Sequence, residues 1–491
     1  MKESSGKVVL SNFIWRFMER IGAQAVNFVV SIVLARLLLP TQYGTVALMN
    51  VFISLLGVFV NCGFSSALIQ KKDADDTDFS TVFYVQLAIC AVLYAGLFLA
   101  APAISAFYNQ DMTSMIRVLG LTLIVAGVKN VQTAYVSRKM IFKRFFFATL
   151  GGTIGAAGVG IGMAVAGLGA WALIGQSLFN NVVDTVILWV TVKWRPKLRF
   201  SWERLKKLFG YGWKMLASSL LDQGYKDLRS LLIGKLYTSE SLAYYDKGQS
   251  WPHLVVDSIN SSVDSVLLPS MAAEQDNRER VKAMTRRSIM ISTFIMMPVM
   301  MGIAVCAEPL VRLVLTEKWL PSVFFMRIFC ITYAFHPVHT ANLNAIKAMG
   351  RSDQFLKLEI MKKVVGIILL VGTMWISVEA MAYSLLASTL FSMIINAWPN
   401  KKLLGYTIFE QFKDIGQGLL QALFMGVVVW TVQLLHLPDL VTLIIQVPLG
   451  VLLYVGISVA IKNETFFYLL GVLRSFVDNR FRKKSPEKRE K

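Results

Sequence analysis

The chain has 491 residues, of which 55% are hydrophobic and 16% are charged, against about 25% charged residues in a soluble domain. Its mean hydropathy is +0.56. A helix that crosses a bilayer needs about 20 mostly apolar residues. This composition supplies enough of them for roughly a dozen or more such helices. It excludes a soluble enzyme, a disulfide-stapled secreted fold, a coiled-coil array and a disordered chain, and it indicates a polytopic membrane protein.

Hydropathy along the chain divides it into fourteen apolar segments. We therefore predict an all-α membrane protein with about 14 transmembrane helices. The expected spans are residues 10–38, 44–69, 79–105, 113–137, 147–167, 170–192, 206–234, 241–271, 288–314, 322–346, 356–377, 379–398, 415–436 and 440–461.

The net charge is +20, and its distribution predicts how the chain is oriented. If the N-terminus is cytoplasmic, the inside connections hold 37 of the 50 Lys and Arg residues. The outside connections hold three: Lys235, Arg312 and Lys318. Positive residues concentrate on the cytoplasmic side of membrane proteins, so both termini are predicted to be cytoplasmic. The basic tail Arg480–Lys491 then suits anionic lipid headgroups, and no nucleic acid is expected as a partner.

Weak internal similarity suggests that the chain is duplicated. Ala35-Arg36-Leu37-Leu38 and Gly234-Lys235-Leu236-Tyr237 end the first and seventh spans, 199 residues apart. Each copy has six spans, so both keep the same orientation. We expect two six-helix lobes around a central cavity, residues 1–205 and 206–400, then a helix pair at 401–462 and a basic cytoplasmic tail at 463–491.

Polar residues recur at helical spacing in four of the expected spans. Because a charge at mid-membrane costs about 2.5–3.5 kcal/mol, these faces are expected to line the cavity. The alternative for the first two arginines is that they snorkel to the headgroups. The residues are Arg16, Arg20, Gln24 and Asn27 in span one, Asn50 and Asn61 in span two, Lys214, Asp222, Tyr225 and Arg229 in span seven, and His253, Asp257, Asn260 and Asp264 in span eight.

The two expected lobes differ in the charge within their spans. Basic residues exceed acidic ones by three in the first lobe, and the two balance in the second. Such a surplus attracts an anion, and Arg can hold phosphate with two parallel hydrogen bonds. The acidic residues either neutralise basic neighbours or carry coupling protons or sodium. Pro252 is expected to break or kink span eight, and His336-Pro337-Val338-His339 reads as a kinked helix or, less often, a ligand pair.

Other sequence features argue against an enzyme. The chain has no Walker P-loop, HExxH, GxSxG or CxxC motif, so no cofactor or metal site is expected. Its four cysteines lie in apolar runs and are expected to be core residues. The glycine-rich fifth span is expected to pack closely against a neighbour. Short outside connections and the lack of an ATPase domain favour a secondary carrier with alternating access.

Several segments resemble the multidrug/oligosaccharidyl-lipid/polysaccharide (MOP) exporter superfamily, and within it the Wzx-type polysaccharide flippases. That branch includes exporters of the teichuronic acid and lipopolysaccharide type. The first 145 residues or so carry most of the likeness, and the rest agrees in layout. The similar segments are Leu34–Leu38 through Pro40, Tyr43-Gly44, Gly63–Lys72, Asp78–Phe83, and Arg138-Lys139-Met140 with Phe142-Lys143.

The resemblance implies a flippase that moves an undecaprenyl-pyrophosphate-linked oligosaccharide from the cytoplasmic to the outer leaflet of the bacterial inner membrane. Polysaccharide polymerase and glycosyltransferases are the enzymes it would meet. The polar-stripe argument assigns the pyrophosphate to Arg16 and Arg20, with Arg36, Lys214 and Arg229 contributing. A peptidoglycan-precursor flippase and an ion-coupled multidrug or metabolite antiporter remain alternatives, and a membrane glycosyltransferase or polymerase is the least favoured one.

Overall fold

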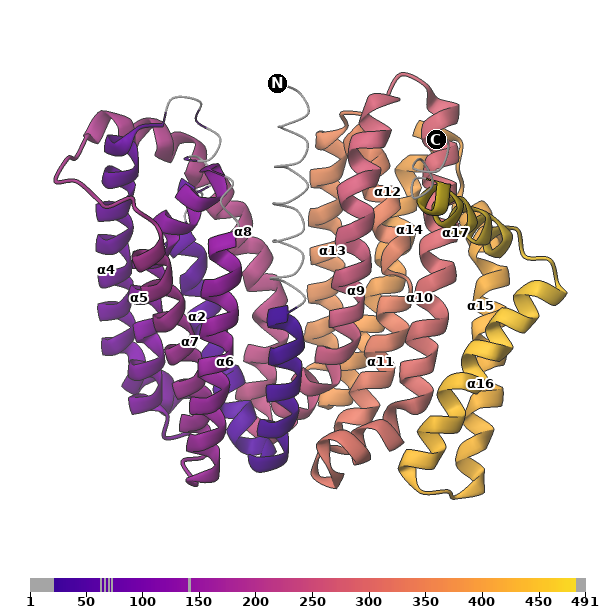
Figure 1. Cartoon of the computed structure of the whole chain (residues 1–491), viewed down its shortest axis with the longest axis horizontal. Coiled ribbons are helices and arrows are strands. Elements are labelled where there is room, and N and C mark those ends of the chain that lie inside the picture. The colour runs from indigo at the N-terminus through magenta and orange to yellow at the C-terminus, as the bar shows by residue number, and fades with distance from the viewer. Residues whose placement is uncertain are drawn as a thin grey trace, which may run out of the picture. The chain divides into compact units, whose positions relative to one another are not determined.

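The computed structural model describes residues 22–61, 64–65, 68, 71, 74–139 and 143–482. In these ranges the chain is helical and contains no β-strand (Figure 1). The elements are a helix at Gly22–Leu37, α2 (Pro40–Asn61), α4 (Asp76–Tyr108), α5 (Thr113–Lys139), α6 (Lys143–Val165), α7 (Ala170–Thr191), α8 (Trp202–Leu236), α9 (Ser239–Ala273), α10 (Arg278–Leu315), η1 (Glu317–Trp319), α11 (Ser322–Ala334), α12 (His336–Ala348), α13 (Ser352–Thr373), α14 (Val378–Leu404), α15 (Ile408–Thr431), η2 (Val432–Leu435), α16 (Asp439–Ala460) and α17 (Glu464–Arg482).

These helices confirm the predicted all-α membrane fold. Eight helices in the described ranges are long and apolar enough to cross a membrane, and the count of fourteen spans stays a prediction. Span ten is divided into α11 and α12 at Phe335. Span eight is one helix, α9, which continues through Pro252 and Pro269, so Pro252 does not end it as one reading of the sequence allowed.

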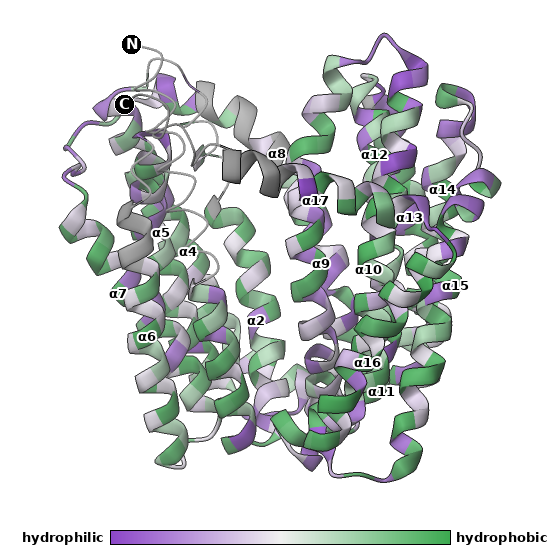
Figure 2. Ribbon diagram, turned by 45° about the vertical axis from the view of Figure 1, so that its right-hand side comes forward, coloured by the Kyte–Doolittle hydropathy of each residue, from purple (hydrophilic) through white to green (hydrophobic). Residues whose placement is uncertain are grey.

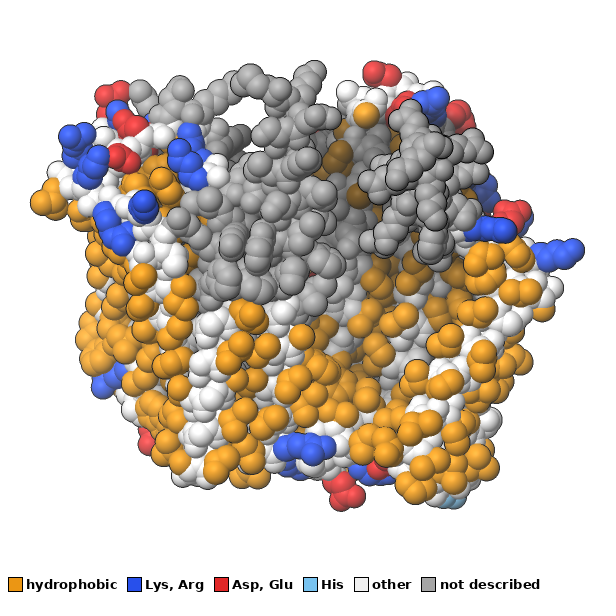
Figure 3. Space-filling model, in the orientation of Figure 1, with side chains coloured by type: hydrophobic (Ala, Val, Ile, Leu, Met, Phe, Trp, Pro, Cys, Tyr) orange, Lys and Arg blue, Asp and Glu red, His pale blue; other side chains and the backbone are white. Residues whose placement is uncertain are grey.

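Apolar side chains cover the middle of the helices on the face shown in Figure 3, and charged side chains gather toward the helix ends. This distribution suits a bilayer, whose core excludes charge. Many large apolar residues are accordingly exposed along the helices, among them Val92, Leu99, Val190, Ile368 and Leu452. In a chain of this class such residues are lipid-facing surface.

The chain separates into two compact units, Met1–Ala243 (unit 1) and Tyr244–Lys491 (unit 2). Helix α8 belongs to unit 1, where it packs on α2 and α4, although the predicted boundary at 205 places it in the second lobe. Gly44 of α2 permits a close contact with the first residue of α9. A Cβ at this position would lie 1.6 Å from the carbonyl oxygen of Ser239, so only glycine allows this approach.

The glycine-rich helix α6 packs closely against α7, as predicted. A Cβ at Gly155 would lie 2.8 Å from the ring of Phe179, and one at Gly160 would lie 3.0 Å from Gln176. Two further glycines with positive φ, Gly167 and Gly169, form the tight turn between these helices, a conformation that favours glycine.

One end of unit 1 is held by residues of the family-like segments. Asp78 is buried, pairs with Lys71 at 2.6 Å, and completes a capping box with Asp75 at the start of α4. The hydroxyls of Ser80 and Thr81 accept from the backbone N–H groups of Lys197 and Ser201. These bonds attach the 192–201 linker between α7 and α8 to α4.

Aromatic stacking and charge strengthen the same attachment. Trp194 of the linker lies 5.7 Å from the ring of Phe79 and stacks on Tyr135 at 6.1 Å. Arg204, just after the linker, forms an ion pair with Asp75. The family-like residues here build the scaffold at the end of the unit.

The Asp75–Arg204 pair predicts a pH dependence. The hydrogen bond from Arg204 lowers the pKa of Asp75 from 3.8 to about 2. Because the folded pKa is depressed, the pair stabilises the fold above about pH 4, and this contribution is lost as pH falls toward 2. Both side chains are partly exposed, so we expect about 1 kcal/mol or less. Thermal unfolding in detergent should show wild type, but not Asp75→Asn, losing this increment between pH 4 and 2.

Asp111→Asn is the control, since Asp111 is an exposed carboxylate of the same unit. This variant should follow the wild-type pH profile. An Asp75→Asn profile identical to wild type through the same range would show that the pair contributes nothing to stability.

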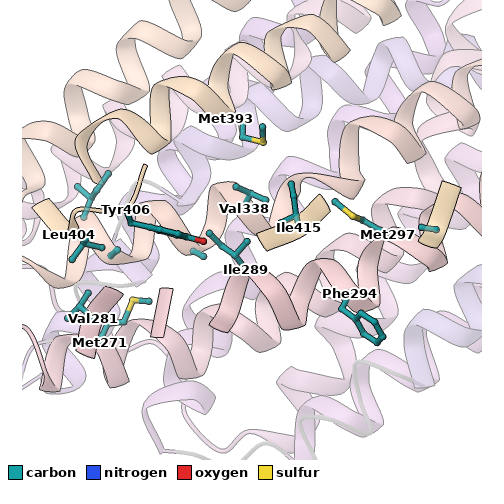
Figure 4. Packing of buried hydrophobic residues seen from close by; sticks show 14 of the residues in the cluster. Met271, Val281, Ile289, Phe294, Met297, Val338, Met393, Leu404, Tyr406 and Ile415 are labelled. Atoms are coloured by element: carbon teal, nitrogen blue, oxygen red, sulfur yellow. The ribbon is translucent and has the colours of Figure 1, made fainter. Parts of the chain in front are cut away.

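Unit 2 has a large apolar core in which α10, α12, α14 and α15 meet (Figure 4). A reciprocal amide pair crosses it: Asn342 donates to Gln411 at 2.8 Å and accepts from it at 3.1 Å. Asn400 also donates to the Asn342 Oδ1 at 2.6 Å. All three amides are almost completely buried, so they specify how α12, α14 and α15 align.

An ion pair also joins α15 to α10. Arg286 donates two hydrogen bonds to Asp414, at 2.7 and 2.8 Å, and Tyr406 donates to the same carboxylate at 2.8 Å. Beyond α16, residues 464–482 of the predicted tail form helix α17, whose Phe466 and Leu469 pack against the core of unit 2.

Cys90, Cys306 and Cys330 are buried and form no disulfide, which confirms the prediction that they are core residues. Cys62 lies outside the described residues.

Candidate functional site

The predicted binding residue that the structure places most distinctly is Arg229. It lies on α8, and its side chain is only 5% exposed. Its Nε and Nη2 atoms have no hydrogen-bond partner among the described residues. Buried guanidinium donors without an acceptor are costly, and an anion that accepted from both of these nitrogens would remove that cost.

The same helix carries the other predicted residues of span seven. Asp222 is exposed and Tyr225 is half-buried, and with Arg229 they follow helical spacing along one face of α8. Lys214 also lies in α8, and its side chain is outside the described part.

A neighbouring contact that the sequence did not single out joins α8 to α2. Asp227 accepts from Ser54 at 2.5 Å and from Gln223 at 2.8 Å. Ser54 lies one helical turn after Asn50 on α2, but its partner 173 residues later depends on how two helices pack. No periodicity along either segment identifies that partner.

The predicted residues of the first two spans are placed only in part. Gln24, Asn27 and Asn50 are exposed polar residues on helices, and Arg36 is exposed near the end of its helix. Arg16 and Arg20, the first choices for the pyrophosphate, lie outside the described residues, as does the side chain of Asn61.

The predicted polar face of α9 divides in two. His253, Asp257 and Asp264 are exposed, and His253 Nδ1 lies 3.2 Å from Asp257 Oδ2. Figure 2 shows hydrophilic positions along this helix. Asn260 instead is buried and contacts His336 at 2.6 Å. The exposed part of this face is suited to contact water within the membrane.

At one place within the spans, an acidic residue pairs with a basic neighbour, as the first of the two alternatives for the acidic residues predicts. Lys129 of α5 lies 3.0 Å from Asp184 of α7, and both side chains are largely buried. Asp264 and Asp227, by contrast, accept from the neutral side chains of Asn344, Ser54 and Gln223. Within the described ranges, no group of three or more His, Cys, Asp or Glu residues could hold a metal ion.

The helical fold, the intramembrane charges and the division into two units define a polytopic membrane protein. Two similar solved structures share this fold. A lipid II flippase MurJ in an inward closed conformation has a TM-score of 0.73 at 14% identity, covering 93% of this chain and 100% of that chain. An inward-facing multidrug resistance MATE family transporter of the MOP superfamily has a TM-score of 0.61 at 16% identity, covering 78% and 94%.

Residues 33–324 match the family described as "Polysaccharide biosynthesis protein", and the chain belongs to this family. It is 24% identical to the teichuronic acid biosynthesis protein TuaB of Bacillus subtilis, over 84% of this chain and 87% of that protein. It is 23% identical to the succinoglycan biosynthesis transport protein ExoT of Rhizobium meliloti, of whose length it spans 64%. The lipopolysaccharide biosynthesis protein WzxC of Escherichia coli is also 23% identical, with 67% and 68% coverage.

Proposed function

We propose that the protein is a flippase that moves an undecaprenyl-pyrophosphate-linked oligosaccharide from the cytoplasmic to the outer leaflet of a bacterial inner membrane. The observation that carries this proposal is the buried guanidinium of Arg229, whose Nε and Nη2 atoms have no hydrogen-bond partner among the described residues, in a chain of this family. Among the lipid-linked cargoes of polysaccharide synthesis, a pyrophosphate headgroup offers paired oxygens that suit it.

In the proposed site, different residues bind the chemically different parts of the substrate. The pyrophosphate binds at Arg229 with Arg16, Arg20, Arg36 and Lys214, whereas the exposed polar side chains of α2 and α8 hydrogen-bond to sugar hydroxyls. The prenyl chain stays in lipid, because exposing each of its CH₂ groups to the water of the chamber would cost about 0.8 kcal/mol.

Translocation follows alternating access, in which the polar faces are exposed to one side of the membrane and then the other. The chain makes and breaks no covalent bond in this process, so it acts as a transporter and not as an enzyme. Both termini lie in the cytoplasm. Glycosyltransferases and a polysaccharide polymerase act on the same lipid-linked substrate, the former before this protein and the latter after it.

Flipping of a peptidoglycan precursor is the second candidate, because the fold resembles a lipid II flippase over 93% of this chain. The two candidates differ in the sugar that accumulates when the protein is absent, so one experiment separates them.

The test is the leaflet accessibility of lipid-linked oligosaccharide in spheroplasts, measured with an impermeant lectin or glycosidase. Deletion should trap intact lipid-linked repeats on the cytoplasmic side. Complementation with Arg16→Ala/Arg20→Ala should then restore export poorly, because two headgroup cations are missing. Export at the wild-type rate would show that these arginines do not bind the headgroup, and repeats that reach the outer leaflet after deletion would disprove the flippase.

A further inference from the structure

Three of the four histidines of the chain lie together in unit 2, beside the interruption between α11 and α12. The ring of Tyr333 lies between two of them, 5.8 Å from His253 and 6.1 Å from His336. His339 follows one helical turn later, 6.0 Å from His336. The fourth histidine, His436, ends η2 in the connection to α16.

Each histidine of α12 contacts an asparagine from another helix in the same way. The Asn260 amide nitrogen lies 2.6 Å from His336 Nδ1, and the Asn396 amide nitrogen lies 3.0 Å from His339 Nδ1. Asn260 is 8% exposed and Asn396 is 1% exposed. The Oδ1 atoms of both asparagines are buried without a hydrogen-bond partner.

Buried amide oxygens without a partner also occur elsewhere in the described residues, but at Asn260 and Asn396 the nitrogen of the same amide lies beside a histidine ring. When the amide N–H donates to Nδ1, the imidazole is neutral. When a proton occupies Nδ1, a half-turn of the amide presents Oδ1 as the acceptor. Each His–Asn pair can therefore satisfy both protonation states of its ring without moving the backbone.

We propose that His336, His339, Asn260 and Asn396 form a proton-binding site that takes up one proton in each transport cycle. The proposal rests on the proposed transport function. Uptake forms an N–H bond at a ring nitrogen with a proton from hydronium, which becomes water, and release reverses it. Two charged rings only 6.0 Å apart would repel one another, so the pair binds a single proton.

The surroundings provide access and charge balance. From α9, His253, Asp257 and Asp264 face His336, and from α13 Lys362 acts on both rings. Lys362 itself pairs with Glu359 at 2.6 Å. Because the side chains of His253 and Asp257 are 49% and 65% exposed, they connect the site to water. Interrupted helices are a recurrent place for coupling ions in carriers.

Histidine NMR of the full-length protein in nanodiscs tests the site, because four histidines give four ring signals. His253→Asn and His436→Asn, two changes outside the proposed site, identify those signals and leave the pair from α12. We expect these two rings to take up one proton between them as the pH is lowered. Absence of uptake, or a full proton at each ring independently, would overturn the proposal.

Asn260→Leu and Asn396→Leu should each weaken proton binding about tenfold or more, since a hydrogen bond to a charged group is lost. The matched control is Asn181→Leu, because the side chain of Asn181 bonds only the Ser177 carbonyl of its own helix among the contacts described. This control should leave the histidine titration unchanged, and equal effects of all three substitutions would contradict the assignment.

Coupling is measured in proteoliposomes that contain the lipid-linked oligosaccharide. An imposed pH gradient should accelerate translocation by the wild type and by Asn181→Leu, but not by Asn396→Leu. Translocation at a rate independent of the gradient would overturn the proposal and leave the flippase standing. Shared proton uptake by a protein that translocates no oligosaccharide would instead disprove the proposed function and retain the proton site.

Discussion

Arg229→Met is expected to reduce oligosaccharide translocation about 10- to 100-fold while leaving folding stability equal to or above that of the wild type. The two effects separate because this guanidinium is buried and its Nε and Nη2 atoms lack partners among the described residues. Two charge-assisted hydrogen bonds to the pyrophosphate disappear, whereas removal of a buried, uncompensated charge relieves its desolvation cost. Leaflet accessibility in spheroplasts measures the first effect, and SDS unfolding in mixed micelles measures the second.

Arg117→Met is the matched control in the same unit. Arg117 donates to the Phe98 carbonyl at 3.3 Å and covers the Phe98 ring, so it has partners on the protein itself. This variant should keep wild-type translocation. If Arg229→Met is instead strongly destabilised, Arg229 supports the packing of α8 and is not held ready for an anion.

Lys129→Met is expected to destabilise unit 1 by about 3 kcal/mol, because it leaves the Asp184 carboxylate among buried groups without its partner. The pair joins α5 to α7 with Nζ and Oδ2 3.0 Å apart, and the second oxygen of Asp184 is already buried without a hydrogen bond. The free energy of unfolding in mixed micelles measures the loss.

The double variant Lys129→Met/Asp184→Leu should recover to within about 1 kcal/mol of the wild type, since both charges are gone. Lys226→Met, at an exposed lysine of α8, should change stability by about 0.5 kcal/mol or less. A double variant as unstable as the single one would show that the methylene chain of Lys129, not its charge, holds the helices together.

The family-like residues of the first 145 positions have a structural explanation. Gly44 permits the approach of Ser239, and Asp78, Ser80 and Thr81 anchor the start of α4 and the 192–201 linker. Arg138 donates to the backbone carbonyls of Leu68 and Lys71. These family-like residues therefore maintain the scaffold, and of the groups proposed to bind substrate or proton only Arg36 lies in a family-like segment.

Hydropathy along the sequence was sufficient for the membrane class and for the approximate position of most described helices, but not for α17, which lies in the predicted tail. The length of an apolar segment and the spacing of residues within it are local properties of the sequence. They do not depend on how one helix packs against another. The same reasoning identified the glycine-rich contact of α6 and the interruption at His336, because Gly and Pro act on their own backbone.

Tertiary structure decided which polar residues have hydrogen-bond partners and which do not. The sequence placed Arg229 and Asp222 on one helical stripe, but only packing of α8 buries the first and exposes the second. His336 and His339 read as a kink, and their partners Asn260 and Asn396 lie 76 and 57 residues away. Pairing across such distances is set by how helices pack, because burial and hydrogen bonding depend on neighbours in space and not on position along the chain.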